Sequence, residues 1–267
     1  MRKNIILIAS VLTIVGCGGG NTTNSMGNSD LNNQNSNYNS RLYDINSSNY
    51  NRATSVCFAS LDDIQEQIDL EKINKILDNN CTQGSYTKDN SLYTFNNCKV
   101  DENYSINGSF EYNNETFKFN KGNVTVKNHL QITTFKSGEY TLRQPYDRIQ
   151  SIKNLNVSAK YKSHFIEVEN LNFEKVENNN NKKIDISAKS SSDIIDSKWI
   201  DIGYTSVNDK IIIKINGKDN SNIILDHNDT TNTTTIKVNN QEMLKDKNET
   251  QKMKTLDKRN LYLEYTK

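Results

Sequence analysis

The chain has 267 residues, and its 33 Lys and Arg against 32 Asp and Glu give a formal net charge of +1. This balance excludes a bulk electrostatic attraction to nucleic acid. Hydrophobic residues make up 34% of the chain and the mean hydropathy is −0.80, so we expect one folded domain with a thin core.

The first sixteen residues are organised like a signal peptide for export. Met1-Arg2-Lys3 is positively charged, and the following segment from Ile5 to Val15 carries no charge. That length suits the apolar core of a signal peptide and falls short of the roughly 20 apolar residues of a transmembrane helix. We therefore predict that residues 1–16 are removed.

The next residues, Ile14-Val15-Gly16-Cys17, resemble the lipobox of bacterial lipoproteins. The resemblance implies a diacylglycerol on Cys17 and an acyl chain such as palmitate on its new amino group, and two or more acyl chains anchor a protein stably. It also implies two partners, the lipoprotein export and processing machinery and the membrane. Gly18, where an Asp would favour the inner membrane, indicates the outer membrane, at its periplasmic face or at the cell surface.

After Cys17 the composition becomes rich in Gly, Asn, Ser and Thr as far as residue 53. Such a segment buries too little apolar surface to offset its ordering entropy. We predict a lipidated cysteine and flexible linker over residues 17–53, followed by a single domain over residues 54–267.

The domain is predicted to begin with a helical segment over residues 60–78. Ser60 is a good N-cap residue, and Asp62 and Asp63 suit the positive end of a helix dipole. The apolar residues before and after Asp69 fall on nearly opposite helix faces, which predicts two helical pieces packed on a sheet.

From Ser91 onward the apolar residues recur with a period of two, which is typical of β-strands. Turn-like clusters separate roughly nine strands, and Asn107-Gly108 and Asn216-Gly217 carry the strongest short hairpin signal. No helical crossover pattern intervenes, so the fold class is mainly β, an antiparallel meander with one apolar and one polar face. A sandwich, a barrel and a curved open sheet all satisfy this pattern.

Three further cysteines, Cys57, Cys81 and Cys98, would lie in an oxidising compartment. They allow one disulfide with three possible pairings, and we favour Cys81–Cys98, which closes a short loop at the turn into the first strand. Such a loop contributes about 3 kcal/mol. The segment from Phe95 to Cys98 is similar to strand ends in uncharacterised exported β-rich proteins.

The chain lacks the common catalytic and nucleotide-binding motifs. His129, His164 and His227 each stand alone in their segments and are interpreted as solvated surface residues. Trp199 is interpreted as a core or cross-strand residue. We predict neither a cofactor nor a metal site.

Eleven asparagines occur in Asn-x-Ser/Thr, the usual glycan acceptor. Five of them also have an Asp two residues earlier, a form that resembles the acceptor of some bacterial oligosaccharyltransferases. These five glycosylation candidates are Asn46, Asn80, Asn103, Asn228 and Asn248.

The expected function is that of a non-enzymatic envelope lipoprotein, a structural or binding module for an unknown protein or glycan partner. Two alternatives stay open. One is a periplasmic lipid or lipoprotein carrier built as an apolar half-barrel, which needs a large apolar concave face. The other is an envelope hydrolase using an acidic pair such as Asp62 and Asp63.

Overall fold

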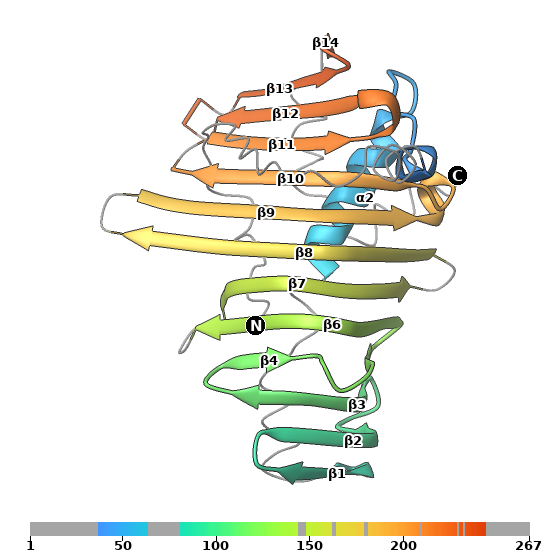
Figure 1. Cartoon of the computed structure of the whole chain (residues 1–267), viewed down its shortest axis with the longest axis vertical. Coiled ribbons are helices and arrows are strands. Elements are labelled where there is room, and N and C mark those ends of the chain that lie inside the picture. Colours follow the sequence, from blue (N-terminus) through green and yellow to red (C-terminus); the bar gives the residue numbers. More distant parts are fainter. Residues whose placement is uncertain are drawn as a thin grey trace, which may run out of the picture.

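The computed structural model describes residues 37–63, 81–143, 148–161, 164–178, 181–208, 210–228, 230–231 and 233–243. These residues form one antiparallel sheet of fourteen strands and two helices (Figure 1). The strands follow one another across the sheet in chain order, except that β5 pairs with both β3 and β6. The prediction of an antiparallel meander with a short helix is confirmed.

The strands are β1 (Gln83–Asp89), β2 (Leu92–Lys99), β3 (Tyr104–Asn113), β4 (Thr116–Lys118), β5 (Val124–Asn128), β6 (Gln131–Arg143), β7 (Arg148–Tyr161), β8 (His164–Asn178), β9 (Asn181–Ser192), β10 (Trp199–Val207), β11 (Lys210–Asn216), β12 (Asn222–Asn228), β13 (Thr233–Val238) and β14 (Gln241–Met243). The helices are a short one at residues 37–41, α2 (Tyr50–Asp63) and two 3-10 turns, η1 (Asp193–Ile195) and η2 (Lys218–Asn220).

One face of the sheet, the dry face, carries the core. Ile202 of β10 lies opposite Ala188 of β9 and Ile215 of β11, and all three are buried. Towards β1 the same face is aromatic, and the rings of Phe95, Phe110, Phe117, Phe119 and Phe135 form a continuous cluster in which each is at most 2% exposed.

The opposite face, the polar face, carries mostly Lys, Glu, Asp, Thr and Asn. Ion pairs cross between neighbouring strands, such as Lys118–Glu139 at 3.2 Å and Lys210–Asp226 at 3.3 Å. The alternation predicted from the sequence is therefore the alternation of a sheet with one buried face.

Helix α2 packs on the dry face over β8 to β11 (Figure 1). Its residues Ala53, Val56 and Cys57 are completely buried. The helix begins ten residues before the predicted start at Ser60, because packing rather than helix propensity stabilises this stretch of small and β-branched residues. Ser60, the predicted N-cap, instead lies inside α2 and bonds to Val56 O and Ser190 Oγ. The rest of the predicted helix, residues 64–78, lies outside the described residues.

The predicted linker is also too long at its C-terminal end. Residues 37–53, assigned to it by composition, lie on the sheet and enter α2. Scattered apolar residues in this segment, Leu42, Tyr43 and Ile45, are buried, which offsets its ordering entropy.

A row of kinks crosses β2, β3, β6, β7 and β8. Pairing registers shift in these strands, and the residues at the shifts adopt positive φ, namely Asn97, Gly108, Gly138, Asn154 and Asn170. Asn107-Gly108, which carries a hairpin signal in the sequence, therefore lies inside β3. Bulges of this kind bend and twist a strand, so a row of them curves the sheet along one line.

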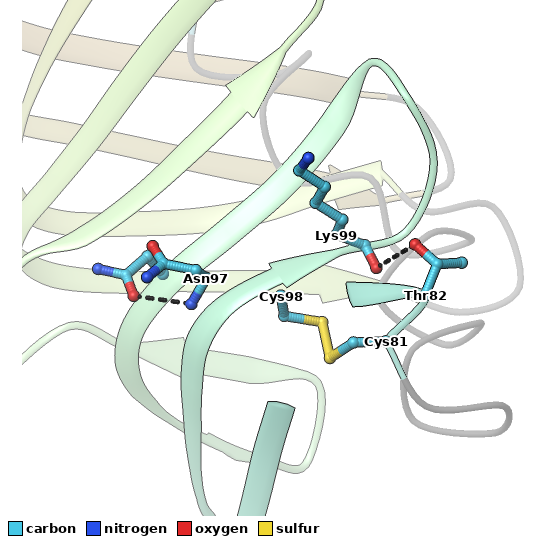
Figure 2. Close-up of a disulfide and its surroundings, with 6 residues drawn as sticks. Cys81, Thr82, Asn97, Cys98 and Lys99 are labelled. Atoms are coloured by element: carbon cyan, nitrogen blue, oxygen red, sulfur yellow. Dashed lines mark hydrogen bonds between the residues drawn. A yellow bond between two sulfur atoms is a disulfide. The ribbon is translucent and has the colours of Figure 1, made fainter. Parts of the chain in front are cut away.

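The disulfide joins Cys81 to Cys98 of β2, as predicted, with Cα atoms 5.3 Å apart (Figure 2). Beside it, Thr82 donates from both its backbone N–H and its hydroxyl to Lys99 O, so the chain is tied to β2 before β1 begins. Cys57 is a buried thiol in α2, outside this bond.

Candidate functional site

The docking segment, residues 37–45, is a short helix at residues 37–41 followed by an irregular stretch, and both parts are bonded to one end of the sheet. It lies at the end of the sheet where β11 finishes and β10 and β12 begin, which we call the tether end. Leu42 forms a parallel bridge with Trp199, Tyr43 N–H donates to Trp199 O at 2.8 Å, and Lys218 N–H donates to Tyr43 O at 2.8 Å. The chain thus passes between β10 and η2 before it enters α2.

Side chains from the turns at this end of the sheet bind the docking segment near its start, at Asn39, and at its end, at Ile45. Asn39 and Asp219 exchange two hydrogen bonds, of 2.7 and 3.0 Å. Ile45 N–H donates to Ser221 Oγ at 3.1 Å, and Asn239 Nδ2 donates to Ile45 O at 2.9 Å. Both backbone groups of Ile45 are therefore satisfied by side chains at this end of the sheet.

The passage needs a glycine at position 217. A Cβ there would lie 2.2 Å from Tyr43 O, far inside contact distance. The Asn216-Gly217 signal in the sequence does mark the connection from β11 to β12, and it also makes room for the docking segment.

Tyr38 fixes the start of the docking segment on the polar face. Its hydroxyl donates to Asp201 Oδ1 at 2.6 Å, and the Lys189 ammonium lies 3.7 Å from its ring centroid. Burial first, and then the hydrogen bond to Asp201, raise the pKa of Tyr38, so the phenol stays protonated. The described part of the chain therefore begins on the polar face.

A second polar cluster lies at the tether end, around η1. His164 Nδ1 lies 2.7 Å from Asp193 Oδ2, and Asp193 Oδ1 accepts from Phe165 N–H at 3.0 Å. Burial alone would raise the pKa of Asp193, but the bonds from Phe165, His164 and Ser192 together lower it. Ser192 Oγ donates to Phe165 O at 2.7 Å and caps η1 at Ile194 N–H.

This cluster contains Ser, His and Asp, the residue types of a hydrolase triad, but they contact one another differently. In a triad the His contacts the Ser and is oriented by the Asp. Here Ser192 contacts Asp193 and a backbone carbonyl and is completely buried. The arrangement suits a structural role: it caps η1 and ties the end of β9 to the start of β8.

The other histidines differ from one another. His227 is 4% exposed on the dry face, opposite Ile211, so its interpretation as a solvated residue is wrong. His129 occupies the β5–β6 turn with φ of +56° and is exposed, as predicted.

Among the described residues no group of three His, Cys, Asp or Glu could hold a metal ion. Within the same residues, no helix combines the length and apolar character needed to cross a membrane.

The dry face is filled by the protein itself. Most of its large apolar side chains on β2 to β13 are at most 8% exposed, Tyr112 and Ile211 are half-buried, and α2 covers part of this face. The large hydrophobic residues that are exposed within the described ranges are Leu130, Ile132 and Val176, which lie in a turn or on the polar face.

Three of the five glycosylation candidates fall on described residues. Asn103 is exposed in the β2–β3 turn, whereas Asn46 and Asn228 are half-buried and their Oδ1 atoms accept hydrogen bonds from Ser48 and Thr231. The remaining two, Asn80 and Asn248, lie outside the described residues, as does the lipidation candidate Cys17.

The Asp of the extended acceptor pattern has a local structural role at Asn103. Asp101 Oδ1 accepts from the N–H groups of Asn103 and Tyr104, both at 2.8 Å. This turn geometry is a second physical reason for an Asp at that position.

Comparisons of the chain with protein-family models, curated proteins and solved structures gave no match. The site must therefore be interpreted from its geometry. Sequence reasoning missed the docking segment, because its anchors on the sheet are more than 150 residues away along the chain. The available signal was its buried residues, Leu42 to Ile45, within a polar stretch.

Proposed function

We propose that this protein is an envelope lipoprotein, anchored through acylated Cys17, whose β-sheet domain serves as a structural or binding module. The observation that carries the proposal is the docking segment. It ties the chain to the sheet from Tyr38 onward, so an anchor at Cys17 would be followed by a link of residues 18–36 and then by a firmly attached domain.

The reach of the link follows from its length. A flexible coil of this size spans about 24 Å on average. The domain would therefore stand close to the membrane surface, nearer than a linker extending to residue 53 would place it. The described chain begins at the polar face, which is also the accessible face, since α2 and the core occupy the other.

A binding or structural role is favoured over a carrier role by the state of the dry face. A lipid carrier needs a large apolar surface open to its cargo. The corresponding surface here is occupied by α2 and by its own side chains. A partner would meet a broad polar face with cross-strand charges, which suits a protein or a glycan.

The test is the intact mass of the protein isolated from its own host, before and after denaturation. We expect a mass above that of residues 17–267 by a diacylglycerol and an acyl chain, and loss of this increment in Cys17→Ala, with release from the membrane fraction. An unmodified Cys17 in a membrane-free fraction would contradict the anchor. A small molecule released only on denaturation would favour the carrier alternative.

A further inference from the structure

We propose that the tether-end corner of the polar face, around the β5–β6 hairpin, docks onto an anionic lipid surface. The patch consists of Lys127, Leu130, Ile132, Lys160 and Phe165. The inference rests on the proposed lipid anchor, and it adds a second contact between the domain and the same membrane.

Sheet register brings four of these residues into one row. Lys127 pairs with Ile132, Ile132 pairs with Lys160, and Lys160 pairs with Phe165. Directly opposed side chains on one face lie about 5 Å apart, so basic and apolar groups alternate across four strands. Leu130 extends the row at the tip of the hairpin.

The apolar members are exposed to a degree that is unusual for this protein. Leu130 is 60% exposed and Ile132 is 43% exposed, while the dry face hides its large apolar side chains almost completely. Exposed apolar side chains among lysines form the surface type that lies at the boundary between lipid headgroups and acyl chains.

The charge of the patch is positive. Lys127 and Lys160 are both exposed, Glu167 is paired with Lys136, and Asp193 is bonded to His164. The nearest other carboxylates, Asp101 and Glu102, belong to the neighbouring β2–β3 turn and lie outside the row. Lysines next to a bilayer are attracted to anionic headgroups over a distance set by the Debye length.

The described chain begins at the same face. Tyr38 lies over Lys189 of β9 on the polar face, three strands from Ile132 of β6 (Figure 1). Three strand spacings are about 14 Å, and Lys189 pairs with Glu169, which lies about 13 Å along β8 from Phe165. The combined separation of about 19 Å is less than the reach of the link. The anchor and the patch can therefore meet one bilayer without strain in the link.

The experiment is amide hydrogen exchange of the intact lipidated protein in vesicles of phosphatidylcholine with or without phosphatidylglycerol. We expect the amides of residues 127–133 to exchange about fivefold more slowly with the anionic lipid, and the protection to fade with added salt. Leu130→Ser with Ile132→Ser should abolish it. Val176→Ser, at the other end of the polar face and 48% exposed, is the matched control and should leave it unchanged.

A second pair of variants tests the charges. Lys127→Gln with Lys160→Gln should remove the salt dependence. Lys214→Gln with Lys237→Gln should not, although these lysines flank Ile224 in a comparable row. Equal exchange in both vesicle types, or an equal effect of both lysine pairs, would overturn the proposal. So would protection that depends on protein concentration without vesicles, since it would assign the patch to a second copy. The mass of the same sample reports acylation of Cys17 separately, so a missing anchor is distinguishable from a patch that does not dock.

Discussion

Asn156 accepts a hydrogen bond from the backbone N–H of Asn170 at 2.8 Å, and Asn172 accepts one from the N–H of Asn154 at 3.0 Å. Two Asn-Leu-Asn segments thus face each other across β7 and β8, with Leu155 opposite Leu171 in the core. The first Asn of each segment has positive φ. The second Asn accepts a hydrogen bond from the backbone N–H of the other segment, which the kink would otherwise leave without a partner.

Removing one of these acceptors should destabilise the kink. We expect Asn156→Ala or Asn172→Ala to lower the free energy of unfolding by about 1–2 kcal/mol, because a backbone N–H loses its partner. Urea denaturation followed by circular dichroism measures this. Asn216→Ala, at an exposed position of β11, is the control. Equal small effects of Asn156→Ala and of the control would show that the two reciprocal hydrogen bonds do not contribute to the free energy of unfolding.

Gly138 provides a sharper test of the kink row. Its φ is +113°, and an added Cβ would lie 2.4 Å from Leu155 Cα. Gly122 has nearly the same φ, +115°, with nothing within 4 Å of the added atom. Both Gly→Ala changes strain the backbone by about 1–3 kcal/mol, but Gly138→Ala also forces β6 and β7 apart.

We therefore expect Gly138→Ala to lower the melting temperature far more than Gly122→Ala, or to prevent folding. Thermal denaturation of the two variants side by side measures the difference. Equal melting temperatures would show that strand spacing at Gly138 relaxes without cost.

The kink row also shows where sequence reasoning stopped. Period-two alternation predicted the antiparallel meander and its buried face correctly, because burial selects side chains two residues apart. It counted roughly nine strands from Ser91 onward, whereas the structure has fourteen and begins with β1 at Gln83. A positive φ at Gly108 or Gly138 serves a hairpin turn and a bulge equally well, so the local sequence does not distinguish them. What distinguishes the bulge is the close approach of the neighbouring strand, at Asn123 for Gly108 and at Leu155 for Gly138.

The docking segment escaped prediction for a related reason. Its composition resembles that of a linker, and the partners that order it, among them Asp201 and Asp219, are distant in sequence. The disulfide was predictable, because Cys81 and Cys98 are close in the chain and flank the first predicted strand.

Loss of the disulfide should cost stability in proportion to its loop. A closure over a sequence separation of 17 contributes about 3 kcal/mol, so we expect Cys81→Ser with Cys98→Ser to lower the melting temperature by about 6–12 °C. A reductant should lower the melting temperature of the native protein and of Cys57→Ala, but should leave that of the double variant unchanged. A double variant that still responds to reductant would indicate another disulfide.

The pH dependence of stability should include Asp193. Its folded-state pKa is lowered below the ordinary value by the bonds from Phe165, His164 and Ser192, so its contribution is present above the unfolded-state pKa of about 4 and is lost as the pH falls below that. We expect Asp193→Asn to flatten the decline in unfolding free energy between about pH 5 and pH 3. Asp196→Asn, at an exposed neighbouring carboxylate, should leave the decline as in the native protein. Identical pH profiles for all three proteins would contradict the role of Asp193.

Glycosylation is best tested at Asn103, because a second exposed turn asparagine, Asn114, lacks the Asp that the extended acceptor pattern adds. Asn103 follows Asp101, whereas Asn114, in the β3–β4 turn, has Tyr112 at the same spacing. If the Asp directs an oligosaccharyltransferase, peptide mass spectrometry of the protein from its own host should find a glycan on Asn103 and none on Asn114. Asn103→Gln should lose the glycan, while Asp101→Asn should lose it only if the acid is part of the recognition. Asn114→Gln should change nothing. An unmodified Asn103 in a host that glycosylates other proteins would leave Asp101 with its structural role alone, as the acceptor for two backbone N–H groups of the turn.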